Sequence, residues 1–218
     1  MDRQLLAWGL RPRRGKLPRL WLFTDEQRLG DPRASVAGLP RGRAGVVLRH
    51  DRDAERVALG RDVARICRDR RLVLVVAGDV RLAASLRAGV HLRAGRWPGP
   101  LRRHGVVTSS AHSVAELRRA RAAGACLGFL SPAFPTASHA GAPGLGPLRW
   151  ARTVRAAAGQ TATAQTVTGA AQTRAAMGRP PGHCLAVAAL GGVDGRTVKR
   201  LPARLLRAVG AIGALRSG

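Results

Sequence analysis

The stretch Gly105-Val106-Val107-Thr108-Ser109-Ser110-Ala111-His112 joins an apolar run to a short polar tip. A second apolar run ends in the same way, at Ser131-Pro132-Ala133-Phe134-Pro135-Thr136. Each run has the length and composition of a short buried strand, and the residues between them have the periodicity of an amphipathic helix. Two strands with polar tips, joined by a helix, predict a βαβ crossover with functional groups at the carboxyl ends of the strands.

The helix between these strands has a start signal in Ser113 and Glu116. Their spacing is that of a capping box, in which two side chains satisfy free backbone N–H groups at the start of a helix. His112 therefore lies at the junction of strand and helix, where parallel α/β folds present side chains to a ligand. The same position also suits a histidine that only hydrogen-bonds the start of the helix, and the spacing alone leaves both interpretations open.

The charge of the chain is unusual for its size. Its 218 residues include 38 Lys and Arg against 12 Asp and Glu, a formal net charge of +26. Such an excess attracts phosphates, nucleic acid or acidic lipids. The arginines are spread along the chain, however, and no aromatic and basic motif accompanies them. This spread favours a compositional bias, so we do not expect a nucleic-acid partner.

The cysteines and the hydropathy of the chain indicate in which cellular compartment the protein is expected. Cys67, Cys126 and Cys184 are far apart and form no CxxC pair, which indicates neither a zinc site nor a disulfide framework. No stretch has the length of a signal-peptide core or of a membrane span, so we expect a cytoplasmic protein with no membrane partner. The basic residues 1–19, which include two prolines, predict a mostly solvated tail ahead of one domain at 20–218.

Eight strand-like segments follow one another along this domain. Helical patterns separate many of them, at residues 53–70, 80–87, 113–123 and 147–158. In the first of these helices, Val57 and Val63 are expected on the face toward the core. This alternation predicts a single (β/α)8 TIM barrel, compact against the typical length of about 250 residues. Residues 160–182 have weak periodicity and predict an irregular insertion before the seventh strand, to which we assign no role. The strands are expected at 20–25, 44–50, 72–77, 90–92, 105–108, the run that ends at Ser131, 184–190 and 208–212.

Glycines mark the ends of the last two strands, as Gly191-Gly192 and Gly213. In barrels a phosphate often lies at the loops after strands seven and eight, where backbone N–H groups meet the anion and glycine allows close approach. The hydroxyl groups of Thr136 and Ser138 are candidate additional donors from the sixth loop. These residues predict a phosphate site, although a Gly-Gly pair is also common in simple turns.

Seven segments resemble those of a known family, both in their sequences and in their order and spacing along the chain. On these segments the chain resembles the thiamin phosphate synthase/TenI family over residues 21–215. The segments are Leu22-Phe23-Thr24-Asp25, Leu48-Arg49, Gly89-Val90-His91-Leu92, Ser110-Ala111-His112-Ser113 with Glu116, Ser131-Pro132-Ala133-Phe134-Pro135-Thr136-Ala137-Ser138, Leu190-Gly191-Gly192-Val193 and Val209-Gly210-Ala211-Ile212-Gly213-Ala214-Leu215.

The resemblance implies a TIM barrel that binds the phosphate of a thiazole. In the synthase branch such a barrel also binds the pyrophosphate of an aminopyrimidine with Mg²⁺, which carboxylates must hold. The family's Asn-Asp pair after the third strand falls here on Ala77 and Gly78, with Asp79 one position later, and the acid expected after the fourth strand is missing from residues 93–97. A glycine at the metal-binding aspartate resembles the TenI branch, which includes thiazole tautomerases that move a proton without a metal.

The resemblance also implies roles for individual residues. His112 matches the general base, for which imidazole is suited because its unperturbed pKa is about 6.5. Ser110 is expected to orient the thiazole ring, and Arg49 to neutralise a carboxylate or a second phosphate. His91 belongs to the strand signature and is expected to be structural. The phosphate is expected at Thr136, Ser138, Gly191, Gly192 and Gly213.

Three functions stay open on the sequence alone. We expect a thiazole tautomerase-like enzyme that needs no cofactor or metal and takes a small phosphorylated thiazole. One alternative is a thiamin phosphate synthase, which joins an aminopyrimidine pyrophosphate to a thiazole phosphate with Mg²⁺. The other is a catalytically degenerate barrel with a binding or regulatory role. The sequence does not determine the oligomeric state.

Overall fold

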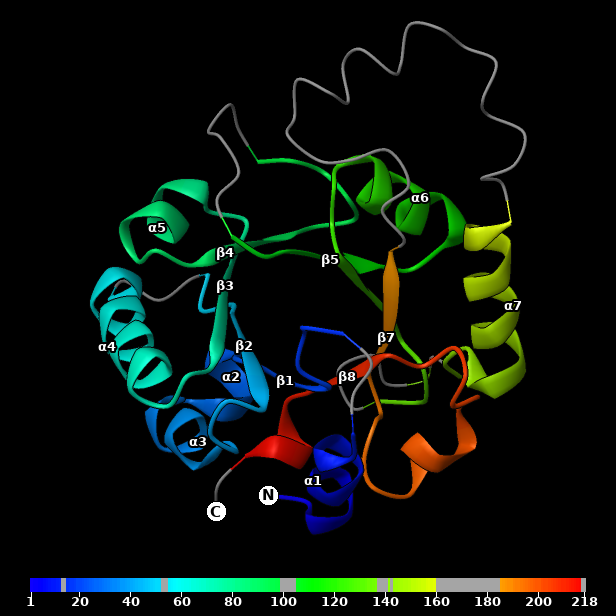
Figure 1. The fold of residues 1–218 in the computed structure, drawn as a ribbon, viewed down its shortest axis with the longest axis horizontal. Coiled ribbons are helices and arrows are strands. Elements are labelled where there is room, and N and C mark those ends of the chain that lie inside the picture. The colour runs from blue at the N-terminus through cyan, green and yellow to red at the C-terminus, as the bar shows by residue number, and fades with distance from the viewer. Residues whose placement is uncertain are drawn as a thin grey trace, which may run out of the picture.

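Eight parallel strands form a closed barrel in sequence order (Figure 1). The computed structural model describes residues 1–12, 15–51, 55–98, 105–136, 141, 143–159 and 185–216, and the insertion expected at 160–182 lies outside them. The barrel closes through β1 and β8, with Leu20 beside Val209, so that the sheet has no free edge. The predicted TIM barrel is thus confirmed. Its strands are β1 (Leu20–Phe23), β2 (Ala44–Leu48), β3 (Val73–Ala77), β4 (Gly89–Leu92), β5 (Val107–Ala111), β6 (Leu127–Leu130), β7 (Ala186–Leu190) and β8 (Ala208–Ala211).

Helices surround the barrel on its outside (Figure 1). Four of them lie where the sequence pattern predicts helices: α4 (Arg56–Asp69), α5 (Val80–Ser85), α6 (Val114–Ala122) and α7 (Gly146–Ala158). The connection between β1 and β2 carries two short helices, α2 (Glu26–Leu29) and α3 (Arg33–Gly38). The loops after β7 and β8 contain only 3-10 turns, η2 (Thr197–Arg200) and η3 (Gly213–Leu215).

The barrel interior is filled by side chains from alternate strand positions. Trp21, Phe23 and Phe129 are buried there, and Phe23 meets Phe129 edge to face with ring centroids 4.8 Å apart. A second apolar layer lies between the sheet and the helices, where Leu59 and Val63 of α4 are buried. Val57 does not share this face, contrary to the sequence prediction, because it lies about 200° around the helix from Leu59 and is 51% exposed.

The N-terminal residues are packed on the barrel, so the expected solvated tail is wrong for this segment. Helix α1 (Arg3–Leu10) buries Leu5 completely and leaves Trp8 7% exposed. Gly9 lies so close to β1 that a Cβ atom there would be 2.1 Å from Cγ of Leu20. The helix lies beside β1 and β8 (Figure 1). Helix α1 thus covers the barrel where β1 and β8 meet.

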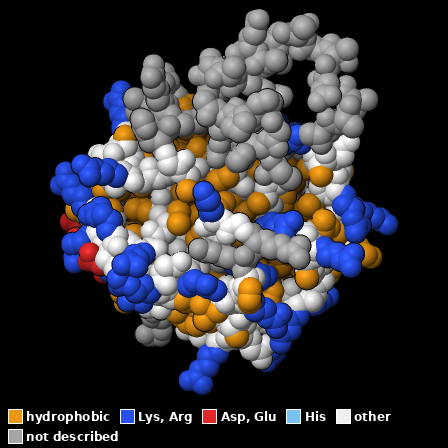
Figure 2. Space-filling model, viewed as in Figure 1, with side chains coloured by type: hydrophobic (Ala, Val, Ile, Leu, Met, Phe, Trp, Pro, Cys, Tyr) orange, Lys and Arg blue, Asp and Glu red, His pale blue; other side chains and the backbone are white. Residues whose placement is uncertain are grey.

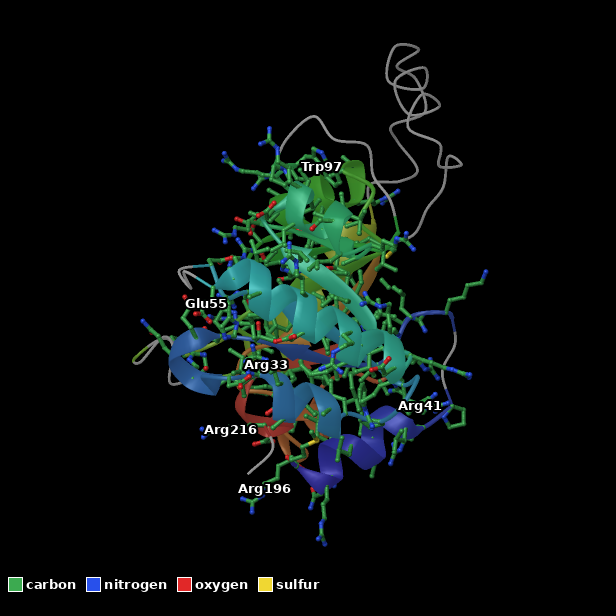
Figure 3. The ribbon with its side chains drawn as sticks, turned by 90° about the vertical axis from the view of Figure 1, so that its left-hand side faces the viewer. Arg33, Arg41, Glu55, Trp97, Arg196 and Arg216 are labelled. Atoms are coloured by element: carbon green, nitrogen blue, oxygen red, sulfur yellow. The ribbon has the colours of Figure 1, made fainter. Side chains whose placement is uncertain are left out.

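Charged side chains are distributed over the surface. Basic groups are spread around the face shown in Figure 2, and acidic groups lie at one edge of it. On the side formed by α3 and α4, Arg33 bridges Asp31 and Asp62 with N–O distances of 3.0 and 2.8 Å (Figure 3). These pairs are half exposed, so water and dissolved salt weaken both of them. Among the described residues, no helix combines the length and apolarity that crossing a bilayer requires.

Candidate functional site

A cavity of about 1010 Å³ opens at the carboxyl ends of the strands, where parallel barrels bind their ligands. All the site residues that the sequence indicates and the structure describes line this one cavity. Ser138 lies outside the described residues. The cavity thus joins residues from five different strand ends: Arg49, Ser110, His112, Thr136, Gly191, Gly192 and Gly213.

His112 follows β5 and is held from two sides. Its ring Nδ1 lies 2.9 Å from the carbonyl oxygen of Ser131, at the end of β6. A carbonyl oxygen only accepts, so Nδ1 carries the proton and Nε2 is the basic nitrogen. The backbone N–H of His112 donates to Glu116 at 2.7 Å. The exposed imidazole is therefore fixed in both orientation and tautomer at the rim of the cavity.

The predicted capping box is confirmed in one half and displaced in the other. The hydroxyl of Ser113 accepts from the backbone N–H of Glu116 at 3.2 Å, as expected. The carboxylate of Glu116, however, accepts a hydrogen bond from the backbone N–H of His112 and not from that of Ser113. The helix start and His112 are thus one hydrogen-bonded unit, and His112 also lines the cavity.

Ser110 points into the barrel because side chains alternate along β5. Its hydroxyl lies 3.4 Å from both the carbonyl oxygen of Leu92 and the N–H of Ala94. Both contacts are long, so this hydroxyl can turn toward a ligand without loss of a strong bond. Ser109 faces the other way, and its hydroxyl accepts from the N–H of Gly95 at 3.0 Å.

The loop after β7 requires glycine. Gly191 and Gly192 have φ angles of 86° and 63°, which favour glycine, and a Cβ atom on Gly192 would lie 2.4 Å from the carbonyl oxygen of Pro135. This close approach brings the sixth and seventh loops together beside Thr136. In the described part of the chain, the N–H groups of Gly192 and Gly213 make no hydrogen bond. They are available to an anion in the cavity.

Asp194 stabilises the same loop. Its carboxylate accepts the N–H groups of Arg196 and Thr197 at 2.8 and 2.7 Å, and the bond from Thr197 is the main cause of the lowered pKa of Asp194. The hydroxyl of Thr197 lies 3.0 Å from the carbonyl oxygen of Gly192. Arg200, one turn further on, lines the cavity with its guanidinium 5.4 Å from the ring of Phe134. This end of the cavity combines backbone donors with a positive charge.

Two further arginines line the opposite wall. Arg49 follows β2, and its N–H donates to the hydroxyl of Thr24 at 2.9 Å. Arg93 follows β4 and is hydrogen-bonded to Asp51, whose second oxygen lies 3.2 Å from Arg56. The cavity therefore has basic side chains at both of its ends.

His91 forms the floor of the cavity. Its Nδ1 lies 2.8 Å from the hydroxyl of Thr108, and its ring meets Phe23 edge to face at 5.4 Å. Burial lowers the pKa of His91 to about 3, and the nearby charges of Arg49 and Arg93 act in the same direction. The ring is therefore neutral at physiological pH. His91 belongs to the barrel core and also lines the cavity.

Comparison with known proteins shows the family of this chain. A sequence model of the family described as thiamine monophosphate synthase (TMP-TenI) matches residues 21–215. The chain belongs to this family. No curated protein sequence gives a significant match.

Solved structures share the fold of this TMP-TenI family member. A thiamine phosphate pyrophosphorylase from Pyrococcus furiosus is 18% identical, with a TM-score of 0.61 over 91% of this chain and 87% of the other. A thiamine phosphate pyrophosphorylase from Bacteroides thetaiotaomicron is 17% identical, with a TM-score of 0.50 over 91% and 84% of the two chains. At such identities the likeness shows the fold alone.

The Mg²⁺ that the synthase branch uses does not fit the residues of this TMP-TenI barrel. Among the described residues, three carboxylates line the cavity, and each already makes contacts within the protein: Asp25 caps α2, Asp51 is paired with two arginines, and Asp194 holds its own loop. Within the described ranges, no group of three His, Cys, Asp or Glu side chains could hold a metal ion. The carboxylates therefore do not form the cluster of oxygen ligands that Mg²⁺ requires.

Sequence reasoning missed the pair formed by Arg93 and Asp51. From the sequence we note only that an expected acid is missing from residues 93–97, and we assign no role to Asp51. An acid after β2 and a base after β4 have opposite charges, at strand ends that only β3 separates. The opposite charges alone do not show that the two side chains of this TMP-TenI chain meet, because the contact depends on the register of β2, β3 and β4.

Proposed function

We propose that this barrel binds a thiazole phosphate carboxylate and catalyses a metal-free proton transfer on it, as the thiazole tautomerases of the family do. The observation that carries the proposal is the bond between Nδ1 of His112 and the carbonyl oxygen of Ser131. It leaves Nε2 as a base at the rim of the cavity that the glycine loops of β7 and β8 also line.

The binding step uses backbone donors. The phosphate lies against the free N–H groups of Gly192 and Gly213, with the hydroxyl of Thr136 at the same end of the cavity. The φ angle and tight packing of Gly192 hold its N–H in place before a ligand arrives. Donors that are fixed in advance lose little entropy on binding. The thiazole ring then lies over the floor of the barrel, where Ser110 turns its hydroxyl toward it.

The chemical step moves one proton. Nε2 of His112 removes a proton from one atom of the thiazole, and the imidazolium returns it to another, so the enzyme ends in its starting state. Ser131 accepts from Nδ1 in both states and stabilises the transient positive charge. The backbone bond to Glu116 keeps the imidazole from swinging out of the cavity.

Deuterium incorporation from D₂O into the thiazole phosphate carboxylate, followed by NMR, tests this function. Wild-type protein should catalyse the exchange without added metal, and His112→Gln should lose it. The variant should still be stabilised by the ligand, by roughly 2.7 kcal/mol at about 100 times Kd. Full turnover by His112→Gln would contradict the assignment of the base.

Inorganic phosphate serves as the control for binding, because so basic a chain attracts any anion. Stabilisation by the thiazole ligand beyond that control, without any exchange, would favour the degenerate barrel. Formation of thiamin phosphate from an aminopyrimidine pyrophosphate and a thiazole phosphate, dependent on Mg²⁺, would favour the synthase.

A further inference from the structure

The corner of the cavity between β2, β3 and β4 holds a chain of alternating charges. Arg56 is largely buried, with a side chain 17% exposed, and lies 3.2 Å from Oδ1 of Asp51 and 3.9 Å from Asp79. Its Nη2 also donates to the carbonyl oxygen of Ala77 at 2.7 Å. The other carboxylate oxygen of Asp51 is bonded to Arg93, whose side chain is 62% exposed. Arg56 thus anchors Asp51 from behind, and Asp51 holds Arg93 at the cavity wall.

The backbone at Gly78 leaves room for this guanidinium. Gly78 has a φ of 66°, and its N–H donates to the carbonyl oxygen of His91 at 3.1 Å. A Cβ atom there would lie 3.2 Å from Nε of Arg93 and 3.4 Å from its Cζ and Nη2. The guanidinium therefore lies directly over the glycine, in the space that a side chain at position 78 would occupy.

Arg49 brings a second positive charge to the same wall. Arg49 and Arg93 both line the cavity, and both charges act on the buried ring of His91 at its floor. Among the described residues of this corner, Asp51 and Asp79 oppose three arginines, namely Arg49, Arg56 and Arg93, so that these five side chains carry one net positive charge. A planar guanidinium held by a carboxylate on one edge presents its other N–H groups to an oxyanion.

We propose that Arg93 and Arg49 form a second oxyanion site, in which the guanidinium of Arg93 supplies the positive charge that a metal ion would supply in a carboxylate-lined corner. The inference rests on the proposed function, and it identifies the ligand class as one with an anionic group at each end. The phosphate binds at the glycine loops of β7 and β8, and the carboxylate binds at the arginines. The site requires no divalent cation.

Binding measurements with two ligands isolate this site. The probes are a thiazole phosphate and the same molecule with a carboxylate on its ring, titrated calorimetrically at moderate salt. Arg93→Ala should weaken binding of the carboxylate form about tenfold, the scale of one charge-assisted hydrogen bond, and leave binding of the plain thiazole phosphate unchanged. Addition of Mg²⁺ or EDTA should change neither affinity in the wild type.

Arg96→Ala is the matched control, because Arg96 is an exposed arginine three residues further on that does not line the cavity. It should bind both ligands as the wild type does. Equal affinities in Arg93→Ala and Arg96→Ala for the carboxylate form would overturn the proposal. So would a wild-type affinity that needs Mg²⁺. Unchanged binding of the plain thiazole phosphate shows that Arg93→Ala is folded.

A separate comparison shows whether the proposed function itself fails. If the wild type binds neither thiazole more tightly than inorganic phosphate, the thiazole assignment fails. Inorganic pyrophosphate then becomes the probe, because it is a compact oxyanion that two neighbouring guanidinium groups can hold. Weaker pyrophosphate binding in Arg93→Ala than in Arg96→Ala would support the arginine site, and equal binding in the two variants would overturn it.

Discussion

One carboxylate oxygen of Asp2 accepts a hydrogen bond at 2.7 Å from the backbone N–H of Gly195, 193 residues away in the chain. The other oxygen caps α1 by accepting from Gln4 and Leu5 at 2.9 and 3.0 Å. The backbone N–H of Asp2 donates to the carbonyl oxygen of Ala214 at 2.8 Å. The start of α1 therefore joins the loops after β7 and β8, which carry the candidate phosphate site.

Substitution of Asp2 should loosen both loops. Asp2→Ala removes the helix cap and the bond to Gly195, and we expect a loss of about 1–2 kcal/mol in the free energy of unfolding. Asp2→Asn keeps an oxygen that can cap the helix, so it should lose less. Urea denaturation measures both. Equal stability of Asp2→Ala and the wild type would show that the contact with Gly195 is not formed in solution.

Removal of the buried side chain of Leu5 tests the packing of α1. Leu5→Ala leaves a cavity beneath the helix and should cost about 2–5 kcal/mol. Leu10→Ala is the matched control, since Leu10 is 44% exposed at the end of the same helix and should cost little. Thermal and urea unfolding of the two variants give the comparison. A solvated N-terminal segment would make both substitutions neutral.

Gly192 should not tolerate a side chain. Gly192→Ala places a Cβ atom 2.4 Å from the carbonyl oxygen of Pro135 and imposes a φ of 63° on a residue that avoids it. We expect about 1–3 kcal/mol of destabilisation. At Gly213 the Cβ position has no atom within 4 Å, so Gly213→Ala should leave the free energy of unfolding nearly unchanged. A similar loss in both variants would contradict the tight contact between the sixth and seventh loops.

The buried ring of His91 should make stability depend on pH. Its pKa is lowered to about 3 in the folded chain, against about 6.5 when unfolded, so only the unfolded state gains a proton between these values. Stability that is complete above pH 6.5 is therefore lost as the pH falls toward 3. Between pH 7.5 and pH 5, this residue should account for about 2 kcal/mol.

His91→Gln removes the titrating group, and the pH dependence of unfolding should flatten in that window. His112→Gln serves as the control because His112 is exposed. Urea denaturation at several pH values measures the slopes. The interpretation fails if His91→Gln and the wild type lose stability in parallel.

Local pattern carried most of the information about the fold. Short apolar runs with polar tips mark strands buried on both faces, and the helical periods between them mark crossovers, so the order of the barrel follows from neighbouring residues. The candidate site could be predicted from the sequence for a similar reason. Residues at the carboxyl ends of parallel strands share one end of a barrel, so Ser110, His112 and Gly191 had to meet there.

Contacts between segments that are distant in the sequence could not be predicted in this way. Nothing near Asp51 in the sequence shows that it binds Arg93, because that contact depends on the register of β2, β3 and β4. Helix α1 could not be predicted from the sequence for a related reason. The prolines and charges of residues 1–19 are typical of a solvated segment, whereas the burial of Leu5 and Trp8 depends on the packing of α1 against the barrel.

The sequence by itself determined the strands, their order, the glycine loops and the place of His112 at the end of β5, because each depends on the chemistry of adjacent residues. Only the tertiary structure decided how Nδ1 of His112 is engaged, which carboxylates are already paired, and where the N-terminal helix lies. These outcomes depend on distances of a few ångströms between segments far apart in the chain, and closure of the barrel sets those distances.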